Sequence, residues 1–208
     1  MNTSILLFRC GVILAFTAFL TPLGAQSGAF LSAGNTEVNG FLGTSFGIDK
    51  ARVMGGGNIS YAVSKHLLPY AEFSYFPGIG RRQEGTFPGT GRPYTATYQI
   101  PLVDFHGGVH VRLPIRESRV VPYGVIGAGV IHSLARTVDA TYDLGGSTVS
   151  QTLSAPARSD FAVNFGGGLR FYATQRFGFR LEAKAYKPTG TFSQVFAKFE
   201  GGVFFQIR

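Results

Sequence analysis

The chain has 208 residues, of which only 14% are charged, whereas about 25% is typical of a soluble globular domain. Its 29 glycines argue against a helical protein, because glycine weakens a helix interior by about 1 kcal/mol relative to alanine, and its 14% aromatic content argues against disorder. The net charge of +8 is spread singly along the chain, which favours an anionic membrane surface over nucleic acid as the partner.

Residues 1–25 have the three parts of a secretory signal peptide. Arg9 precedes an apolar stretch that runs from Cys10 to Leu20, and Ala25 supplies the small residue before the expected cleavage point. The apolar stretch is too short for a membrane-spanning helix, which needs about 20 residues. Because Cys10 is the only cysteine, the mature chain has none, and we expect no disulfide and no cysteine-based metal site.

From residue 26 onward, apolar and polar residues alternate with a period of two, which predicts β-strands with two unlike faces. In the segment 159–174, for example, Phe161, Phe165 and Phe171 share one face, while Asn164 and Arg170 share the other. Turn signals separate the segments. We predict eight strands, at residues 38–48, 51–64, 67–77, 95–113, 120–136, 159–173, 177–188 and 194–207.

The connections between these strands alternate in character. Three short turns are expected on one side, near residues 64–66, 113–119 and 175–176. The second side has short connections at 48–51 and 188–193, and two long loops, rich in Gly, Pro, Ser and Thr, at 78–94 and 137–158. Short turns at one end and longer loops at the other are typical of an outer-membrane barrel whose turns face the periplasm.

The strand lengths point to the same architecture. Segments of ten or more residues exceed the usual soluble strand of about 5–6 residues and suit a tilted strand that crosses a bilayer in about 9–11 residues. A closed barrel is the β-structure that pairs every backbone N–H and C=O group in lipid. We therefore predict that residues 26–208 form one eight-stranded, antiparallel, up-and-down transmembrane β-barrel.

The polar face of the strands is predicted to form a charge network inside the barrel. Residues of opposite charge on neighbouring strands can pair in a lumen that eight strands leave just wide enough for side chains. The predicted members are Arg52, Glu72, Asp104, Arg112, Arg170, Arg180, Glu182, Lys184, Lys198 and Glu200, joined by His106 and His110. The alternative interpretation is that these residues form the solvated outer face of a soluble, exported, ligand-binding β-barrel.

Aromatic residues gather toward both ends of the predicted strands. Two aromatic girdles are expected where a barrel meets the lipid headgroups. The predicted loop-end girdle consists of Tyr75, Phe76, Tyr94, Tyr98, Phe161 and Tyr186, and the predicted turn-end girdle of Tyr123, Phe171, Tyr172, Phe177, Phe204 and Phe205.

Together with the eight strands and the signal peptide, the glycine-rich segments 53–63, 165–171 and 199–205 resemble the OmpA-type outer-membrane β-barrel domain. The resemblance implies a location in the outer membrane of a Gram-negative cell envelope and insertion by the outer-membrane assembly machinery. Members commonly end in an aromatic residue that this machinery reads, so Phe205 and Ile207 are expected to serve in its place here. The resemblance implies no single activity, because members anchor, adhere, resist stress or conduct weakly.

The sequence predicts no catalytic residue, no metal site and no cofactor. The glycine runs lack the spacing and the partner residues of a P-loop or a dinucleotide-binding turn. His132 and Ser133 are adjacent on one strand, so their side chains point to opposite faces and cannot pair. His106 and His110 lie roughly 13 Å apart along one strand, too far for one metal ion.

The long loops carry five arginines: Arg81, Arg82, Arg92, Arg136 and Arg158. They either contact phosphates of lipopolysaccharide, since arginine pairs well with phosphate, or are simply solvated. We expect a monomeric barrel with a structural or interaction role, whose partners are outer-membrane lipids, lipopolysaccharide and the assembly machinery. A narrow channel or transporter, the soluble exported barrel and, last, an enzyme remain as alternatives.

Overall fold

The computed structural model describes residues 31–47, 51–87, 89–115, 118–144, 147–190 and 195–207. The predicted signal peptide, residues 1–25, lies outside these ranges, as do the side chains of residues 78–81 and 140–149. Within the described part of the chain, no helix has the length and apolar character needed to cross a membrane.

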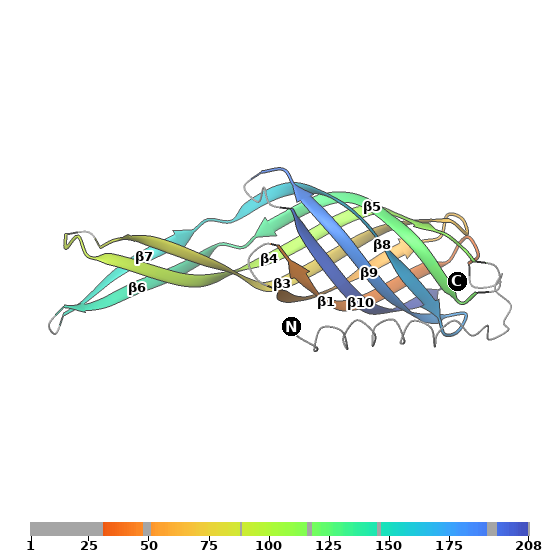
Figure 1. Cartoon of the computed structure of the whole chain (residues 1–208), viewed down its shortest axis with the longest axis horizontal. Coiled ribbons are helices and arrows are strands. Elements are labelled where there is room, and N and C mark those ends of the chain that lie inside the picture. Colours follow the sequence, from red (N-terminus) through yellow and green to blue (C-terminus); the bar gives the residue numbers. More distant parts are fainter. Residues whose placement is uncertain are drawn as a thin grey trace, which may run out of the picture.

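The described residues form ten β-strands, and eight of them close into a barrel (Figure 1). The strands are β1 (Thr36–Phe46), β2 (Arg52–Tyr61), β3 (Leu67–Thr86), β4 (Pro93–Arg112), β5 (Val120–Ser133), β6 (Arg136–Leu144), β7 (Ser147–Ala155), β8 (Arg158–Tyr172), β9 (Phe177–Pro188) and β10 (Phe196–Ile207). Around the barrel the order is β1-β10-β9-β8-β5-β4-β3-β2, with antiparallel pairing throughout. The predicted eight-stranded antiparallel barrel is confirmed.

The prediction of long loops at residues 78–94 and 137–158 is wrong, because most of these residues lie in strands. β3 and β4 are each 20 residues long and stay paired beyond the barrel, from Ile79↔Ile100 to Thr86↔Pro93. β6 and β7 form a separate two-stranded sheet. Both hairpins extend from one end of the barrel (Figure 1), and β6 contacts β4. We call residues 79–100 and 136–155 together the arm.

The composition of the arm explains why it pairs instead of looping. Thr and Tyr recur along β6 and along the arm part of β4, and β-branched and aromatic residues suit a pleated, paired backbone. Two glycines serve the turn between β3 and β4. Gly89 and Gly91 have φ angles of 79° and 65° at the β3–β4 tip, a left-handed conformation that favours glycine.

The apolar face of the barrel strands points outward. Phe165 and Leu181 are both 61% exposed, whereas their neighbours Asn164, Arg180 and Glu182 are buried inside. The same alternation runs along all eight barrel strands, so the outer wall is a continuous apolar band. This arrangement contradicts the soluble exported barrel, which would enclose the apolar face.

The predicted aromatic girdles are only partly right. Tyr75, Phe161 and Phe205 lie on the outer face, and Tyr94 and Tyr98 lie on the arm, beyond the barrel wall. Five of the assigned residues are buried in the lumen: Phe76, Tyr123, Tyr172, Tyr186 and Phe204. The physical reason is strand phase, because residues an even number of positions from an inward-facing charge also point inward.

A compact aromatic cluster remains on the outer face at the turn end. The ring of Phe177 lies 5.0 Å from that of Phe179 and 5.1 Å from that of Phe205, and Phe171 lies 6.4 Å from Phe179, measured between ring centroids. We call Phe171, Phe177, Phe179 and Phe205 the turn-end aromatic cluster. Rings of this kind mark the depth at which a barrel meets the headgroups.

Candidate functional site

The lumen is filled in three layers. We call the end of the barrel that carries the arm the loop end, and the opposite end the turn end. At the loop end lies an apolar layer of Phe41, Met54, Phe76, Leu102, Ile131, Ala162, Tyr186 and Phe196. At the turn end, Val121, Tyr172 and Phe204 form a second apolar layer, against which Leu31 of the segment before β1 packs. Charged side chains occupy the space between the two layers, so the polar centre is closed by apolar side chains at both ends.

Inward-facing glycines make room for aromatic rings in the lumen. At Gly56, a Cβ atom would lie 2.7 Å from the Phe41 ring and closer still to the backbone of β3, and at Gly168 it would lie 2.6 Å from the hydroxyl oxygen of Tyr123. Both distances are below van der Waals contact. Glycine is therefore used where a ring or a neighbouring backbone occupies the space of a side chain.

Glu72 on β3 is the centre of the network. Its carboxylate accepts hydrogen bonds from Lys184 Nζ at 2.5 Å, Lys198 Nζ at 3.1 Å and Asn58 Nδ2 at 3.2 Å. Lys198 Nζ also donates to Asp104 Oδ2 at 3.2 Å. These contacts join β3 to β9, β10 and β2, and β10 to β4. Hydrogen bonds between charged groups are shorter and stronger than those between neutral groups.

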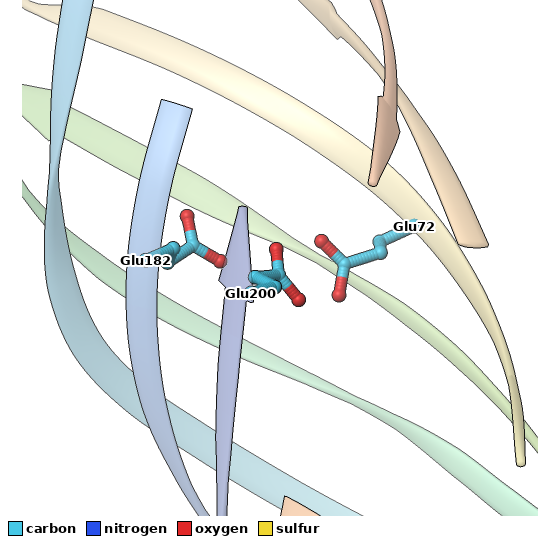
Figure 2. Close-up of side chains that lie close together, drawn as sticks. All are labelled: Glu72, Glu182 and Glu200. Atoms are coloured by element: carbon cyan, nitrogen blue, oxygen red, sulfur yellow. The ribbon is translucent and has the colours of Figure 1, made fainter. Parts of the chain in front are cut away.

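Three carboxylates converge at this centre. Glu72, Glu182 and Glu200 each place an oxygen within 4.8 Å of the other two (Figure 2). Such a trio suits a divalent cation in its chemistry, but here the protein's own cations lie among the three. Lys184 Nζ lies 2.6 Å from Glu182 as well as bonding Glu72, and Arg180 donates to Glu200. Within the described residues, the charge of the trio is met by side chains.

A second group of ions lies nearer the turn end, around Glu37 of β1. Arg170 donates to Glu37 Oε2, Gln206 Nε2 donates to Oε1 at 2.9 Å, and Arg112 Nη1 lies 3.5 Å from Oε1. Arg170 also contacts Nδ1 of His110 at 2.8 Å. Glu37 was not predicted as a member of the network because the predicted strand begins at residue 38, whereas β1 begins at Thr36.

Histidine and tyrosine side chains fill the remaining polar space. The ring of His110 stacks on Tyr70 with 4.3 Å between centroids, and His106 pairs with Asp104. Tyr123 donates a hydrogen bond to Glu182 Oε2 at 2.5 Å. Both histidines thus serve as packed members of the lumen.

The structure brings together nine of the ten predicted network residues. Fully buried in the lumen are Glu72, Asp104, Arg112, Arg170, Arg180, Glu182, Lys184, Lys198 and Glu200. Arg52 is only half-buried at the start of β2, near the loop end. With Glu37 added, the network has five buried carboxylates and five buried cations. The network is therefore formally neutral, which a dry interior requires. Asp160, a further buried carboxylate, lies at the loop-end start of β8, outside this network.

The loop-end arginines are not gathered at one point. Arg136 begins β6 and Arg158 begins β8, so both lie beside the barrel mouth. Arg82 is on the arm, where its guanidinium lies 2.7 Å from exposed Glu84, and Arg92 is near the arm's tip. The side chain of Arg81 lies outside the described set.

Comparison with known proteins supports the fold. No protein-family model matches the chain, and no curated protein matches it by sequence. Among solved structures, Neisserial surface protein A (NspA) superposes with a TM-score of 0.53 at 10% identity, over 83% of this chain and 96% of that one. The N-terminal β-barrel domain of Pseudomonas aeruginosa OprF has a TM-score of 0.48 at 14% identity, over 84% and 98%. For Ail of Yersinia pestis the values are 0.48 and 13%, over 84% and 99%.

This chain has the fold of a small outer-membrane β-barrel. At these identities, the likeness establishes the fold of the outer-membrane barrel and not the activity of any neighbour.

One polar pair on the outer wall of the outer-membrane barrel was not predicted from the sequence. His132 Nδ1 lies 2.7 Å from Ser159 Oγ, across the β5–β8 pairing. Ser133, considered from the sequence, faces inward and is bonded to the backbone of Arg158. Among the described residues, no carboxylate contacts His132, so the third group that orients the histidine of a catalytic triad is missing there.

Proposed function

We propose that this protein is an outer-membrane barrel with a structural and interaction role. Its sealed lumen stabilises the membrane-embedded part, and its arm carries the contacts made outside the membrane. The observation that carries this proposal is the filled lumen, in which a neutral charge network lies between two apolar layers. The predicted signal peptide, residues 1–25, would direct its export.

The filled lumen argues against the narrow channel or transporter. An ion crossing the barrel would have to pass the loop-end layer around Phe41 and Tyr186 and then separate pairs such as Lys184 with Glu72. Breaking a buried ion pair costs about 3–5 kcal/mol. Passage would need several such steps in succession.

Planar-bilayer recording of the full chain tests the proposal. We expect no conductance above the bare bilayer after insertion, with heat-modifiable gel migration of the same sample showing that the barrel is folded. Steady single-channel steps from folded protein would reject the sealed barrel and favour the channel.

We further propose that lipopolysaccharide phosphates meet the arginines beside the barrel mouth. Arg136 and Arg158 begin strands at the level where the wall ends. Arg92, near the tip of the arm, is eight residues from residue 100, where the arm leaves the barrel. At the rise of a β-strand it therefore lies roughly 25 Å farther out. Only Arg136 and Arg158 of these three lie near headgroup depth.

Lipopolysaccharide binding by the folded full chain distinguishes these arginines. Replacing Arg136 and Arg158 with serine should weaken binding about 30-fold, at about 1 kcal/mol for each cation near an anionic surface. Arg92→Ser is the matched control and should leave affinity unchanged. An equal loss of affinity for each arginine removed, whether at the barrel mouth or at Arg92, would mean that the arginines act only through net charge.

The remaining partners are also proposals. Phe205 and Ile207 lie on the outer face of β10, where the assembly machinery would contact the last strand during insertion. A closed barrel leaves no free strand edge in the membrane, which favours a monomer. We propose no enzymatic role, because the His132–Ser159 pair has no acid partner among the described residues.

A further inference from the structure

We infer that the turn end of the barrel binds anionic phospholipid headgroups of the adjacent membrane leaflet through Lys65, Arg119 and Arg176. We call these three residues the basic rim. The inference concerns the end of the barrel opposite to the arm and does not depend on the proposed lipopolysaccharide contact.

Each described short turn at this end contributes one cation to the basic rim. Lys65 lies between β2 and β3, Arg119 between β4 and β5, and Arg176 between β8 and β9. Lys65 and Arg176 are exposed, and Arg119 is half-buried. Within the described ranges, no carboxylate pairs with any of the three. Arg116 and Glu117, which lie outside those ranges, carry opposite charges, so the rim keeps a surplus of positive charge.

The turns that carry the basic rim are held in place by hydrogen bonds from arginine side chains to their backbone. Arg119 Nη1 donates to the carbonyl oxygen of Ala173 at 3.3 Å, and Arg112 Nη2, from inside the barrel, donates to that of Ser64 at 2.8 Å. The three turns join six consecutive strands of the barrel order. Neighbouring turns are therefore roughly 10 Å apart, at about 4.8 Å per strand, so the three cations are spread along the rim and each can meet a separate phosphate.

The turn-end aromatic cluster fixes the depth of the rim. Arg176 directly precedes Phe177, whose ring packs against Phe179 and Phe205 on the outer wall. Aromatic rings at a barrel's end lie at the level of the headgroups, so the Arg176 guanidinium lies at phosphate depth.

A second observation agrees with this depth. Leu113 and Ile115 are in the β4–β5 turn, past the end of β4, and they are 59% and 55% exposed. Apolar side chains that extend past the strands, next to cations, are the composition of a segment that lies on a membrane surface. Separate cations at headgroup depth suit separate lipid phosphates.

The experiment uses the full chain, which contains no tryptophan. A Phe177→Trp variant therefore carries a single fluorescent reporter beside the basic rim. The folded variant is placed in phosphatidylcholine vesicles that contain brominated phosphatidylglycerol or brominated phosphatidylcholine, and quenching gives the relative occupancy of the two lipids beside the reporter. Phe205→Trp, whose parent ring is 5.1 Å from that of Phe177, is the second reporter if the first fails to fold.

We expect phosphatidylglycerol to be preferred beside the reporter. The preference should fall as the salt concentration rises to about 1 M, where the Debye length is only about 3 Å. Arg176→Ser in the reporter background should lower the preference about fivefold, the effect of one cation near an anionic surface. Arg82→Ser removes the same charge from the arm and should leave it unchanged.

Three results would overturn the inference. The first is equal quenching by the two lipids. The second is an equal loss from Arg176→Ser and Arg82→Ser, which would assign the preference to net charge. The third is loss of the preference on adding inorganic phosphate at constant ionic strength, which would indicate a site for free phosphate.

Discussion

Replacing Glu72 with glutamine should strongly destabilise the barrel. The substitution keeps the volume of the side chain and removes its charge, while Lys184 Nζ at 2.5 Å and Lys198 Nζ at 3.1 Å stay buried beside it. The neutral balance of five carboxylates and five cations becomes a surplus of one positive charge. Removing one partner of a buried pair costs about 3–5 kcal/mol, which is about a 150- to 5000-fold change in the unfolding equilibrium.

Denaturant unfolding of the full chain in vesicles measures this loss, with the folded fraction read from heat-modifiable gel migration. The matched control is Glu84→Gln, which breaks the exposed 2.7 Å pair with Arg82 and should cost less than about 1 kcal/mol. Adding Lys198→Met to Glu72→Gln restores neutrality, so the double variant should be more stable than the sum of the single losses by about 1 kcal/mol or more. If Glu72→Gln cost no more than Glu84→Gln, the lumen would be hydrated enough to solvate its ions, and the sealed network would be refuted.

Three further predictions address the outer wall and the packing of the lumen. Leu181→Arg places a charge on the lipid-facing wall, where Leu181 is 61% exposed, and should lower folding stability in vesicles by about 2–4 kcal/mol; a neutral result would contradict the lipid-facing orientation. Gly56→Ala would bring a Cβ to 2.7 Å from the Phe41 ring and should cost about 1–3 kcal/mol, whereas Gly40→Ala, with no atom within 4 Å, should be close to neutral in the same unfolding assay. A fluorophosphonate probe should not label Ser159 of the folded protein above the level of Ser159→Ala, because no acid orients His132; labelling that disappears in His132→Ala would establish a nucleophilic serine.

Strand identity and the inward or outward direction of each side chain follow from the sequence. Successive side chains on a strand point to opposite faces, so Arg170 and Phe171 must face opposite ways wherever the strand lies. The barrel parts of the strands begin and end within three residues of their predicted positions, except that the fourth strand was predicted from residue 95 and the barrel part of β4 begins at residue 101. The same rule would have assigned Tyr172 and Phe204 to the lumen, since they share the phase of Arg170 and Glu200. Their assignment to a girdle followed position along the strand and ignored phase.

The extent of pairing beyond the membrane was not predictable from local signals. The glycines and prolines of residues 78–94 resemble loop composition, yet Ile79 to Thr86 pairs continuously with Pro93 to Ile100. Once the barrel fixes the register of β3 and β4, the pairing continues outward, because each added residue pair extends a ladder that is already nucleated.

The partner of each ion was decided by closure of the barrel. Alternation places Glu72, Lys184 and Lys198 on inward faces, but these residues come from β3, β9 and β10, and they meet only because the sheet curls until its first and last strands pair. His132 and Ser159 likewise become neighbours because β5 pairs with β8, although the β6–β7 hairpin separates these two strands in the chain. A sequence specifies the phase of a strand through contacts two residues apart, whereas contacts across a lumen depend on register and curvature, which belong to the closed sheet as a whole.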